Sequence, residues 1–168
     1  MKTLGILGGM SWESTLVYYR LINQGVAARL GGLHSAKLLL HSVDFAEVAV
    51  LQRDGRWAEA GALLGHAGAG LRAAGAEGLL IATNTMHKVA EGVTRGNGLP
   101  LLHIGDATGA ALKVAGHRRA GLLGTRFTMD DPGIVQDRLR LHQGLQVRVP
   151  GDDDRAEVGG HPRLEVQV

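Results

Sequence analysis

The stretch that decides the fold is Gly78-Leu79-Leu80-Ile81-Ala82-Thr83-Asn84-Thr85-Met86-His87. Its first four residues form an apolar run of strand length, and polar residues typical of a helix start follow at once. Apolar runs of the same kind recur along the chain, and segments with helical spacing or turn residues separate them. We therefore expect six strands, at residues 3–7, 36–41, 78–81, 101–104, 119–123 and 145–149.

Most of the segments that connect the predicted strands have patterns typical of helices. The first is the clearest, because Leu16, Tyr19, Ile22 and Val26 recur at helical spacing after Ser11, a candidate N-cap. This pattern predicts a helix over residues 13–30, and weaker patterns predict helices over 57–74, 87–93, 106–115 and 132–142.

Apolar strands that alternate with helices are typical of a parallel sheet covered on both faces. We predict an α/β fold with three parts. Residues 1–116 form a four-stranded parallel sheet domain flanked by helices, residues 117–150 form a fragment of a second, incomplete α/β domain, and residues 151–168 form an irregular tail.

Composition excludes several classes of protein. Eighteen Lys and Arg against sixteen Asp and Glu leave a net charge of +2, too small to indicate nucleic-acid binding. The sequence contains no apolar stretch of membrane-spanning length and no export-type cleavage site, so we expect a cytoplasmic protein without a membrane partner. The chain has no cysteine, which excludes disulfides and thiolate metal sites, and its histidines lack metal-ligand spacing. No metal is expected.

Polar loops follow the ends of four predicted strands. In open parallel sheets, ligands bind beyond the carboxyl ends of the strands, so such loops can converge on one polar cleft. Turn formation and helix capping are the alternative reading of the same residues, and the sequence leaves both open. The loops are Gly8-Gly9-Met10-Ser11, Ser42-Val43-Asp44 with the later Gln52 and Arg53, Thr83-Asn84-Thr85, and Gly124-Thr125-Arg126-Phe127-Thr128.

Five segments of the chain together resemble one family, the cofactor-independent aspartate/glutamate racemases, in the branch of broad-specificity amino-acid racemases. The resemblance runs in order from Met1 to about Pro150. It is carried by Gly5-Ile6-Leu7-Gly8-Gly9-Met10-Ser11-Trp12-Glu13-Ser14-Thr15, Leu33-His34-Ser35-Ala36, His41-Ser42-Val43-Asp44-Phe45, Thr83-Asn84-Thr85-Met86-His87-Lys88 and Leu122-Leu123-Gly124-Thr125-Arg126.

The resemblance implies a subunit with two similar α/β domains and a substrate cleft between them. It implies two-base chemistry, in which one cysteine thiolate removes the α-proton of an amino acid and a second thiol protonates the opposite face. It implies neither pyridoxal phosphate nor a metal. By matching motif, the residues that would hold the amino acid are Met10, Gln52, Thr83, Asn84 and Thr85, with Thr125 and Thr128 contributed by the second domain.

Two departures from the family pattern bear on activity. The first family cysteine aligns with Ala82, whose methyl group can neither take nor give a proton. The second lies in a Gly-Cys-Thr-Glu-like segment that this chain lacks, as expected of a truncated homologue. We therefore expect a racemase by descent that is inactive as it stands. The alternatives are a non-catalytic module that binds an amino acid or carboxylate or a partner, and a different enzyme that uses Ser42, Asp44 or His87. For assembly, a homodimer and non-specific self-association both stay open.

Overall fold

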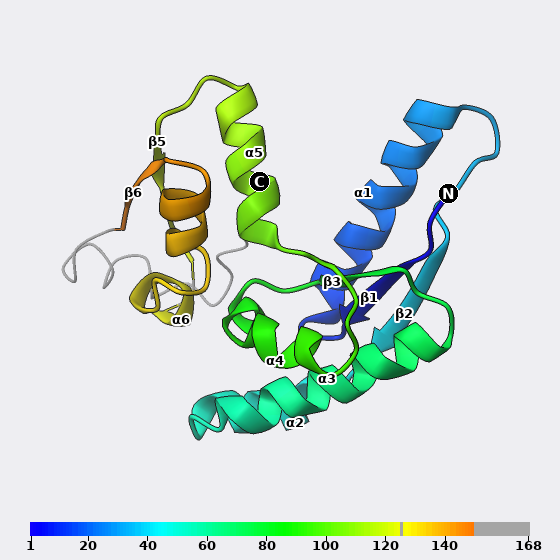
Figure 1. Ribbon diagram of the computed structural model, residues 1–168, viewed down its shortest axis with the longest axis horizontal. Helices are drawn as coiled ribbons and strands as arrows, with labels where there is room; N and C mark the ends of the chain where they lie inside the picture. Colours follow the sequence, from blue (N-terminus) through cyan, green and yellow to red (C-terminus); the bar gives the residue numbers. More distant parts are fainter. Residues whose placement is uncertain (125, 150–168) are drawn as a thin grey trace. The chain divides into compact units, whose positions relative to one another are not determined.

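The structure is a computed structural model that describes residues 1–124 and 126–149. The chain forms two compact units, which are described separately below (Figure 1). Unit 1 comprises Met1–Thr83 and Val89–Leu102, and unit 2 comprises Asn84–Lys88 and the chain from His103 onward. The domain limits predicted from the sequence stay a prediction, and the predicted tail lies outside the described residues.

Unit 1 contains the predicted four-stranded parallel sheet. The strand order is β2-β1-β3-β4, so β1 lies inside the sheet and β2 lies at one edge. The bounds are β1 Leu4–Gly8, β2 Leu38–Ser42, β3 Gly78–Ile81 and β4 Leu101–Leu102, and every pairing is parallel. Because the four strands and their direction agree with the apolar runs, the fold predicted from the sequence is confirmed.

Helices cover both faces of this sheet (Figure 1). A Cβ added to Gly5 would lie 3.2 Å from Leu71, whereas one added to Gly8 would lie 2.6 Å from Thr15. Since Gly5 and Gly8 point to opposite faces of β1, the helices that carry Leu71 and Thr15 lie on opposite sides of the sheet. The helices of unit 1 are α1 Trp12–Leu30, α2 Phe45–Arg53, α3 Trp57–Ala73 and α4 Ala90–Arg95.

Helix α2 was not predicted from the sequence. A helix of nine residues is marginal in isolation, so its periodicity is a weak signal. In the structure, the Asp44 carboxylate caps it by accepting the Ala46 N–H at 2.9 Å, and Val48 is fully buried. The cap and this single anchor stabilise a segment that the sequence leaves ambiguous.

Unit 2 holds a second, smaller sheet. Strands β5 (Arg119–Gly121) and β6 (Gln146–Arg148) pair in parallel, with Arg119 opposite Gln146. This confirms a β-α-β fragment after the first sheet domain. A two-stranded sheet is marginal by itself, and here it packs on a local apolar core. The buried residues of that core are Ile134, Val135, Leu139, Leu145 and Val147, with Ile104, Leu112 and Leu122 against it.

Several predicted boundaries in this part are wrong. The fourth strand ends at Leu102 rather than at residue 104, because His103 is the N-cap of α5 (Ile104–Val114). The helix predicted over 132–142 begins only at residue 136, after a turn over 132–135, and runs through the π-helical segment η2 (Arg138–His142), while α6 (Arg126–Asp130) precedes it and was not predicted. Pro132 cannot donate a backbone hydrogen bond, and Asp131 accepts the Gly133 N–H at 3.0 Å, so the chain turns here instead of continuing a helix.

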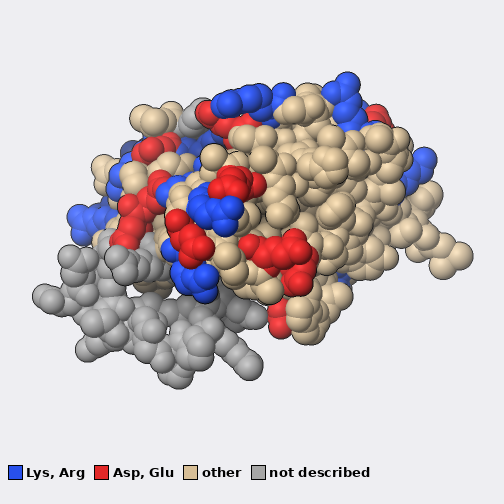
Figure 2. All heavy atoms as spheres, turned by 90° about the horizontal axis from the view of Figure 1, so that it is seen from below, with Lys and Arg blue, Asp and Glu red and all other residues tan. Residues whose placement is uncertain are grey.

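The distribution of charged side chains on the surface and the character of the helices agree with what the composition predicts. On the face shown in Figure 2, acidic and basic side chains lie among one another rather than in separate patches. Among the helices in the described part of the chain, none is both long and apolar enough to cross a membrane.

Candidate functional site

The loop after β1 is shaped by its glycines. Gly9 has φ +93°, and a Cβ at this position would lie 2.2 Å from the Val43 carbonyl oxygen, which is backbone and cannot move aside. Only glycine combines this left-handed conformation with so close an approach. The β1–α1 turn is therefore packed directly against the end of β2.

Thr15 holds the same loop from inside α1. Its Oγ1 accepts the Gly9 N–H at 3.0 Å and donates to the Ser11 carbonyl at 3.2 Å, and its side chain is buried. Sequence reasoning did not single out Thr15, because a threonine inside a helix gives no signal of its own. Ser11 is the N-cap residue as predicted, but its hydroxyl makes no capping bond to the helix.

Backbone hydrogen bonds bring three strand ends to one edge of the sheet in unit 1. The Val43 N–H donates to Gly8 at 3.0 Å, and the Ala82 N–H donates to Leu7 at 2.9 Å. Met10 and Ala82, which follow β1 and β3, are buried, and Thr83 is half-buried. The structure thus places these three predicted site residues at the carboxyl edge, as the parallel sheet requires. Gln52 lies in the last turn of α2.

In unit 2, two predicted site residues are in contact. The Asn84 side-chain amide donates to Thr128 Oγ1 at 3.2 Å, although the two residues are 44 positions apart. Thr128 is buried within α6, and Thr85 begins the 3₁₀ helix η1 (Thr85–Val89). Thr125, predicted for the same role, lies outside the described residues. The substrate-binding roles of all these residues stay predictions.

The other half of the Asn84 amide has no partner. Its Oδ1 is buried and, among the described residues, accepts no hydrogen bond. A buried amide oxygen left unsatisfied costs about 1–3 kcal/mol. An amide oxygen is a hydrogen-bond acceptor, so this atom keeps an unused acceptor capacity.

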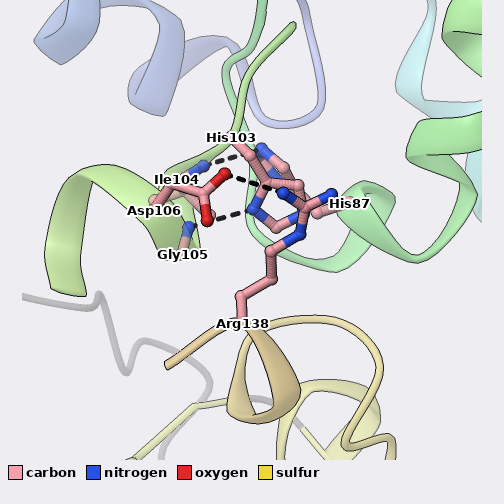
Figure 3. A network of polar contacts seen from close by, with 6 residues as sticks. All are labelled: His87, His103, Ile104, Gly105, Asp106 and Arg138. Carbon is pink, nitrogen blue, oxygen red and sulfur yellow. Dashed lines mark hydrogen bonds and ion pairs between the residues drawn. The ribbon is translucent and has the colours of Figure 1, made fainter. Parts of the chain in front are cut away.

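Two buried histidines, His87 and His103, lie close together (Figure 3), and His87 contacts Asn84. His87 Nε2 accepts the Ile104 N–H at 3.3 Å, which assigns the proton to Nδ1 and lets Nδ1 donate to the Asn84 carbonyl at 3.2 Å. His103 Nδ1 accepts the Gly105 N–H at 3.1 Å, and the two rings meet edge to face at 4.4 Å. This geometry favours a hydrogen-bonding role for His87 over the catalytic role that the sequence left open.

Two ion pairs fasten the segments around these histidines. Arg138 of η2 reaches Asp106 of α5 at 2.7 Å (Figure 3), and Lys88 of η1 reaches Asp131 at 2.6 Å. All four side chains are about one-third exposed, so each pair contributes modestly to stability, on the order of 1 kcal/mol or less. Their main effect is on position, because they tie η1 to the turn after α6 and α5 to η2.

The chemistry of the site follows from these groups. Within the described residues, no three His, Asp or Glu side chains are placed to hold a metal ion. Ala82 offers only a methyl group at the end of β3, and the sequence has no thiol. Within each unit, the predicted site residues carry hydroxyl, amide or backbone groups that can hydrogen-bond a small polar molecule.

A parallel sheet flanked by helices, with polar loops at its carboxyl edge, places the chain in the α/β class, in which ligands bind beyond the carboxyl ends of the strands. The sequence model of the Asp/Glu/hydantoin racemases matches residues 7–162. The chain therefore belongs to the Asp/Glu/hydantoin racemase family.

Solved structures of similar proteins support this family assignment. A Yersinia pestis protein provisionally described as an Asp/Glu racemase shares 53% identity and a TM-score of 0.88, over 94% of this chain and 68% of that one. An aspartate racemase homologue from Pyrococcus horikoshii OT3 shares 32% identity and a TM-score of 0.80, over 95% and 69%. An aspartate racemase from Picrophilus torridus, at 20% identity and a TM-score of 0.73, shares the fold. The chain thus spans about two thirds of the relatives it matches.

Proposed function

We propose that this chain is an amino-acid racemase by descent that does not racemise, and that it retains binding of a small amino acid. The single observation that supports the loss of activity is the alanine at position 82. It stands at the end of β3, fully buried, where the resemblance places the first catalytic cysteine, and no other cysteine exists in the chain.

The physical reason is the weak acidity of the α-proton beside a carboxylate. Its removal needs a poised base on one face and a proton donor on the other. Losing one positioned base costs roughly two to four orders of magnitude in rate. His87, five positions after Ala82, has both ring nitrogens engaged with the backbone and supplies no substitute.

The test uses the purified chain with L- and D-aspartate and glutamate in deuterium oxide. Chiral chromatography and mass spectrometry follow inversion and α-deuterium incorporation, with a cysteine-containing family member as the positive control. We expect no inversion above the buffer rate. Clear turnover by the unmodified chain would refute the proposal.

Retained binding is supported by the unpartnered Asn84 Oδ1. An ammonium group is a suitable donor for this oxygen, so aspartate should bind more tightly than succinate, which has the same carboxylates and no ammonium. A hydrogen bond with a charged group is worth about 1.5–3 kcal/mol, or roughly tenfold or more in affinity. Isothermal titration calorimetry measures both ligands.

The matched variants for this measurement are Asn84→Ala, which removes the acceptor, and Gln24→Ala, an exposed position on α1, as the control. Asn84→Ala should abolish the preference for aspartate, and Gln24→Ala should leave it unchanged. Equal affinity of the unmodified chain for aspartate and succinate, or no binding of either, would refute the binding role and leave the partner-binding alternative.

A further inference from the structure

Two imidazole rings are buried in unit 2 where η1 meets the start of α5. His87 of η1 is 3% exposed, and His103, the residue before α5, is 4% exposed. Their ring centroids lie 4.4 Å apart, and the rings meet edge to face (Figure 3). Histidine is the side chain whose ordinary pKa, about 6.5, lies within the physiological pH range. Protonation of this pair therefore bears directly on how the two segments pack.

Each ring accepts a backbone N–H from the first turn of α5. His103 is the N-cap residue, and its Nδ1 accepts the Gly105 N–H at 3.1 Å. His87 Nε2 accepts the Ile104 N–H at 3.3 Å. An imidazole nitrogen accepts a hydrogen bond only while it carries no proton, because an imidazolium is a donor at both nitrogens. Both bonds therefore require neutral rings, whereas the usual N-cap residues Ser, Thr, Asp and Asn still accept at about pH 5.

A positive charge is also unfavourable at this end of a helix. Helix α5 has 11 residues, and the free N–H groups of its first turn give its N-terminus a partial positive charge. Two imidazolium rings with centroids 4.4 Å apart would in addition repel each other. The hydrogen bonds, the helix dipole and the repulsion between the rings thus all favour the uncharged pair in the arrangement that the structure shows.

The charged side chains on the surrounding elements offset one another. Asp106 of α5 pairs with Arg138 of η2 at 2.7 Å, and Lys88 of η1 pairs with Asp131 at 2.6 Å. The other oxygen of Asp106, Oδ1, is buried and accepts no hydrogen bond from either ring. The remaining described charged residues of these elements are exposed or partly exposed, so water and salt screen their effect on the buried rings; they are Lys113, Asp130, Asp137 and Arg140. The hydrogen bonds to α5, rather than the surrounding charges, therefore decide the protonation of the pair.

We propose that His87 and His103 form a pH-sensitive switch between η1 and α5, which is closed while both rings are neutral and opens when they are protonated. In the opened or unfolded chain each ring takes up a proton near pH 6.5, whereas the closed switch excludes it. Because the open state then binds more protons than the closed one, the closed state keeps its full stability above about pH 6.5 and loses stability as pH falls below that value. Opening frees η1, whose His87 ring bonds the Asn84 carbonyl. The switch does not depend on whether the chain binds an amino acid.

Amide hydrogen exchange of the full chain, followed by NMR between about pH 7.5 and about pH 5, tests the switch. Each rate is divided by that of an unstructured amide at the same pH, which leaves the opening equilibrium. Opening at the Ile104 and Gly105 amides should rise below about pH 6.5, by up to roughly tenfold per pH unit for each histidine that takes up a proton. The Leu122 N–H, which donates to the Arg148 carbonyl at 2.9 Å in the sheet of unit 2, is the internal reference and should keep its protection. An equal loss of protection at Leu122 would mean that unit 2 unfolds as a whole and would overturn the proposal.

Two substitutions remove the dependence on protons and keep an acceptor. In His103→Asn the amide oxygen caps α5 at every pH of the experiment, and in His87→Gln the amide can accept the Ile104 N–H and donate to Asn84. Each single variant should lower the pH dependence of opening from two protons to one, and the double variant should abolish it. His117→Gln, at an exposed position just after α5, is the matched control and should leave the pH dependence unchanged.

A measurement on the unmodified chain needs no variant to fold. The nitrogen-15 chemical shifts of the rings at about pH 7.5 should show a neutral His87 with its proton on Nδ1 and a neutral His103 with its proton on Nε2. An imidazolium at either position at this pH would overturn the proposal. So would opening at Ile104 and Gly105 that does not change with pH, or a pH dependence that the double variant retains.

Discussion

Asn84 donates its side-chain amide to Thr128 at 3.2 Å and thereby joins the loop after β3 to helix α6. Asn84 also accepts, through its carbonyl oxygen, from the backbone and the ring of His87 at 3.0 Å and 3.2 Å. The residue is thus held from both sides, while its Oδ1 is left without a partner among the described residues. A side chain held in one orientation loses little entropy when it forms a further hydrogen bond.

Replacing Thr128 by valine should destabilise the protein without changing its shape. The variant keeps the side-chain volume but leaves the Asn84 amide without its acceptor, and Thr128 is only 1% exposed. We expect a loss of about 1–2 kcal/mol in the free energy of unfolding, measured by urea titration. Thr94→Val, whose hydroxyl bonds only backbone oxygens of its own helix, is the control and should cost less. Equal costs would contradict the importance of the Asn84 contact.

Gly9→Ala should be among the most damaging single-methyl changes in unit 1. The new Cβ would lie 2.2 Å from the Val43 carbonyl oxygen in addition to the strain of a positive φ. We expect a loss of about 3 kcal/mol or more by thermal or urea unfolding. Gly31→Ala separates the two effects, because Gly31 also has a positive φ but nothing within 4 Å of the added carbon. Its expected cost is about 1 kcal/mol, and similar losses for both variants would show that the close approach is unimportant.

Ala82→Cys should not restore racemisation. The substitution offers a base on one face of the α-carbon only, and nothing else in the chain carries a thiol for the other. Slow α-deuterium exchange without inversion is the largest effect expected, measured by mass spectrometry and chiral chromatography. Ala82→Ser, of similar size but far less acidic, is the control and should show no exchange. Inversion by Ala82→Cys would mean that a second proton donor exists in this chain.

Tyr18 should make the protein sensitive to alkali. Burial raises the pKa of the Tyr18 phenol above its ordinary value of 10.0, because the phenolate is poorly solvated in α1. In the unfolded chain the phenol ionises near pH 10, so the unfolded state binds fewer protons there and stability falls as pH rises above 10. Tyr18→Phe should reduce this fall between pH 9.5 and about 11, measured as the urea midpoint against pH.

Tyr19, the exposed neighbour of Tyr18, provides the control for the measurement of the urea midpoint against pH. Tyr19 is 54% exposed, and Tyr19→Phe should leave the pH dependence of the urea midpoint as it is in the unmodified chain. If Tyr18→Phe and Tyr19→Phe changed the alkaline slope equally, burial of Tyr18 would not be its cause.

The alternation of strand and helix was predictable because burial imposes it on the sequence. A strand covered on both faces must be apolar throughout, and the runs at 3–7 and 78–81 met this condition and lie within one residue of β1 and β3. Short elements were less predictable. Helix α2 depends on the Asp44 cap and on burial of Val48, and the turn at Pro132 depends on the Asp131 bond to Gly133, so packing and capping outweigh weak periodicity there.

The candidate site, like the fold, was predictable from the sequence only in part. Its location at the strand ends could be predicted, since the carboxyl ends of parallel strands share one edge. The role of Thr15 could not, because its two hydrogen bonds form only when the β1–α1 turn folds back on the helix. The support that His87 gives to Asn84 likewise requires α5, whose Ile104 N–H assigns the ring proton.

By itself the sequence determined the parallel α/β class and the lack of a thiol in these residues, because buried strands require apolar runs and a cysteine is either encoded or not. Ala82 and the lack of cysteine are read directly from the sequence. Only the tertiary structure decided which distant residues meet, such as Asn84 with Thr128 and Gly9 with Val43, and which apolar residues stay uncovered on α1. The spacing of apolar residues predicts that one face of a helix is apolar. It does not predict what packs on that face, because this depends on the fold of the whole chain.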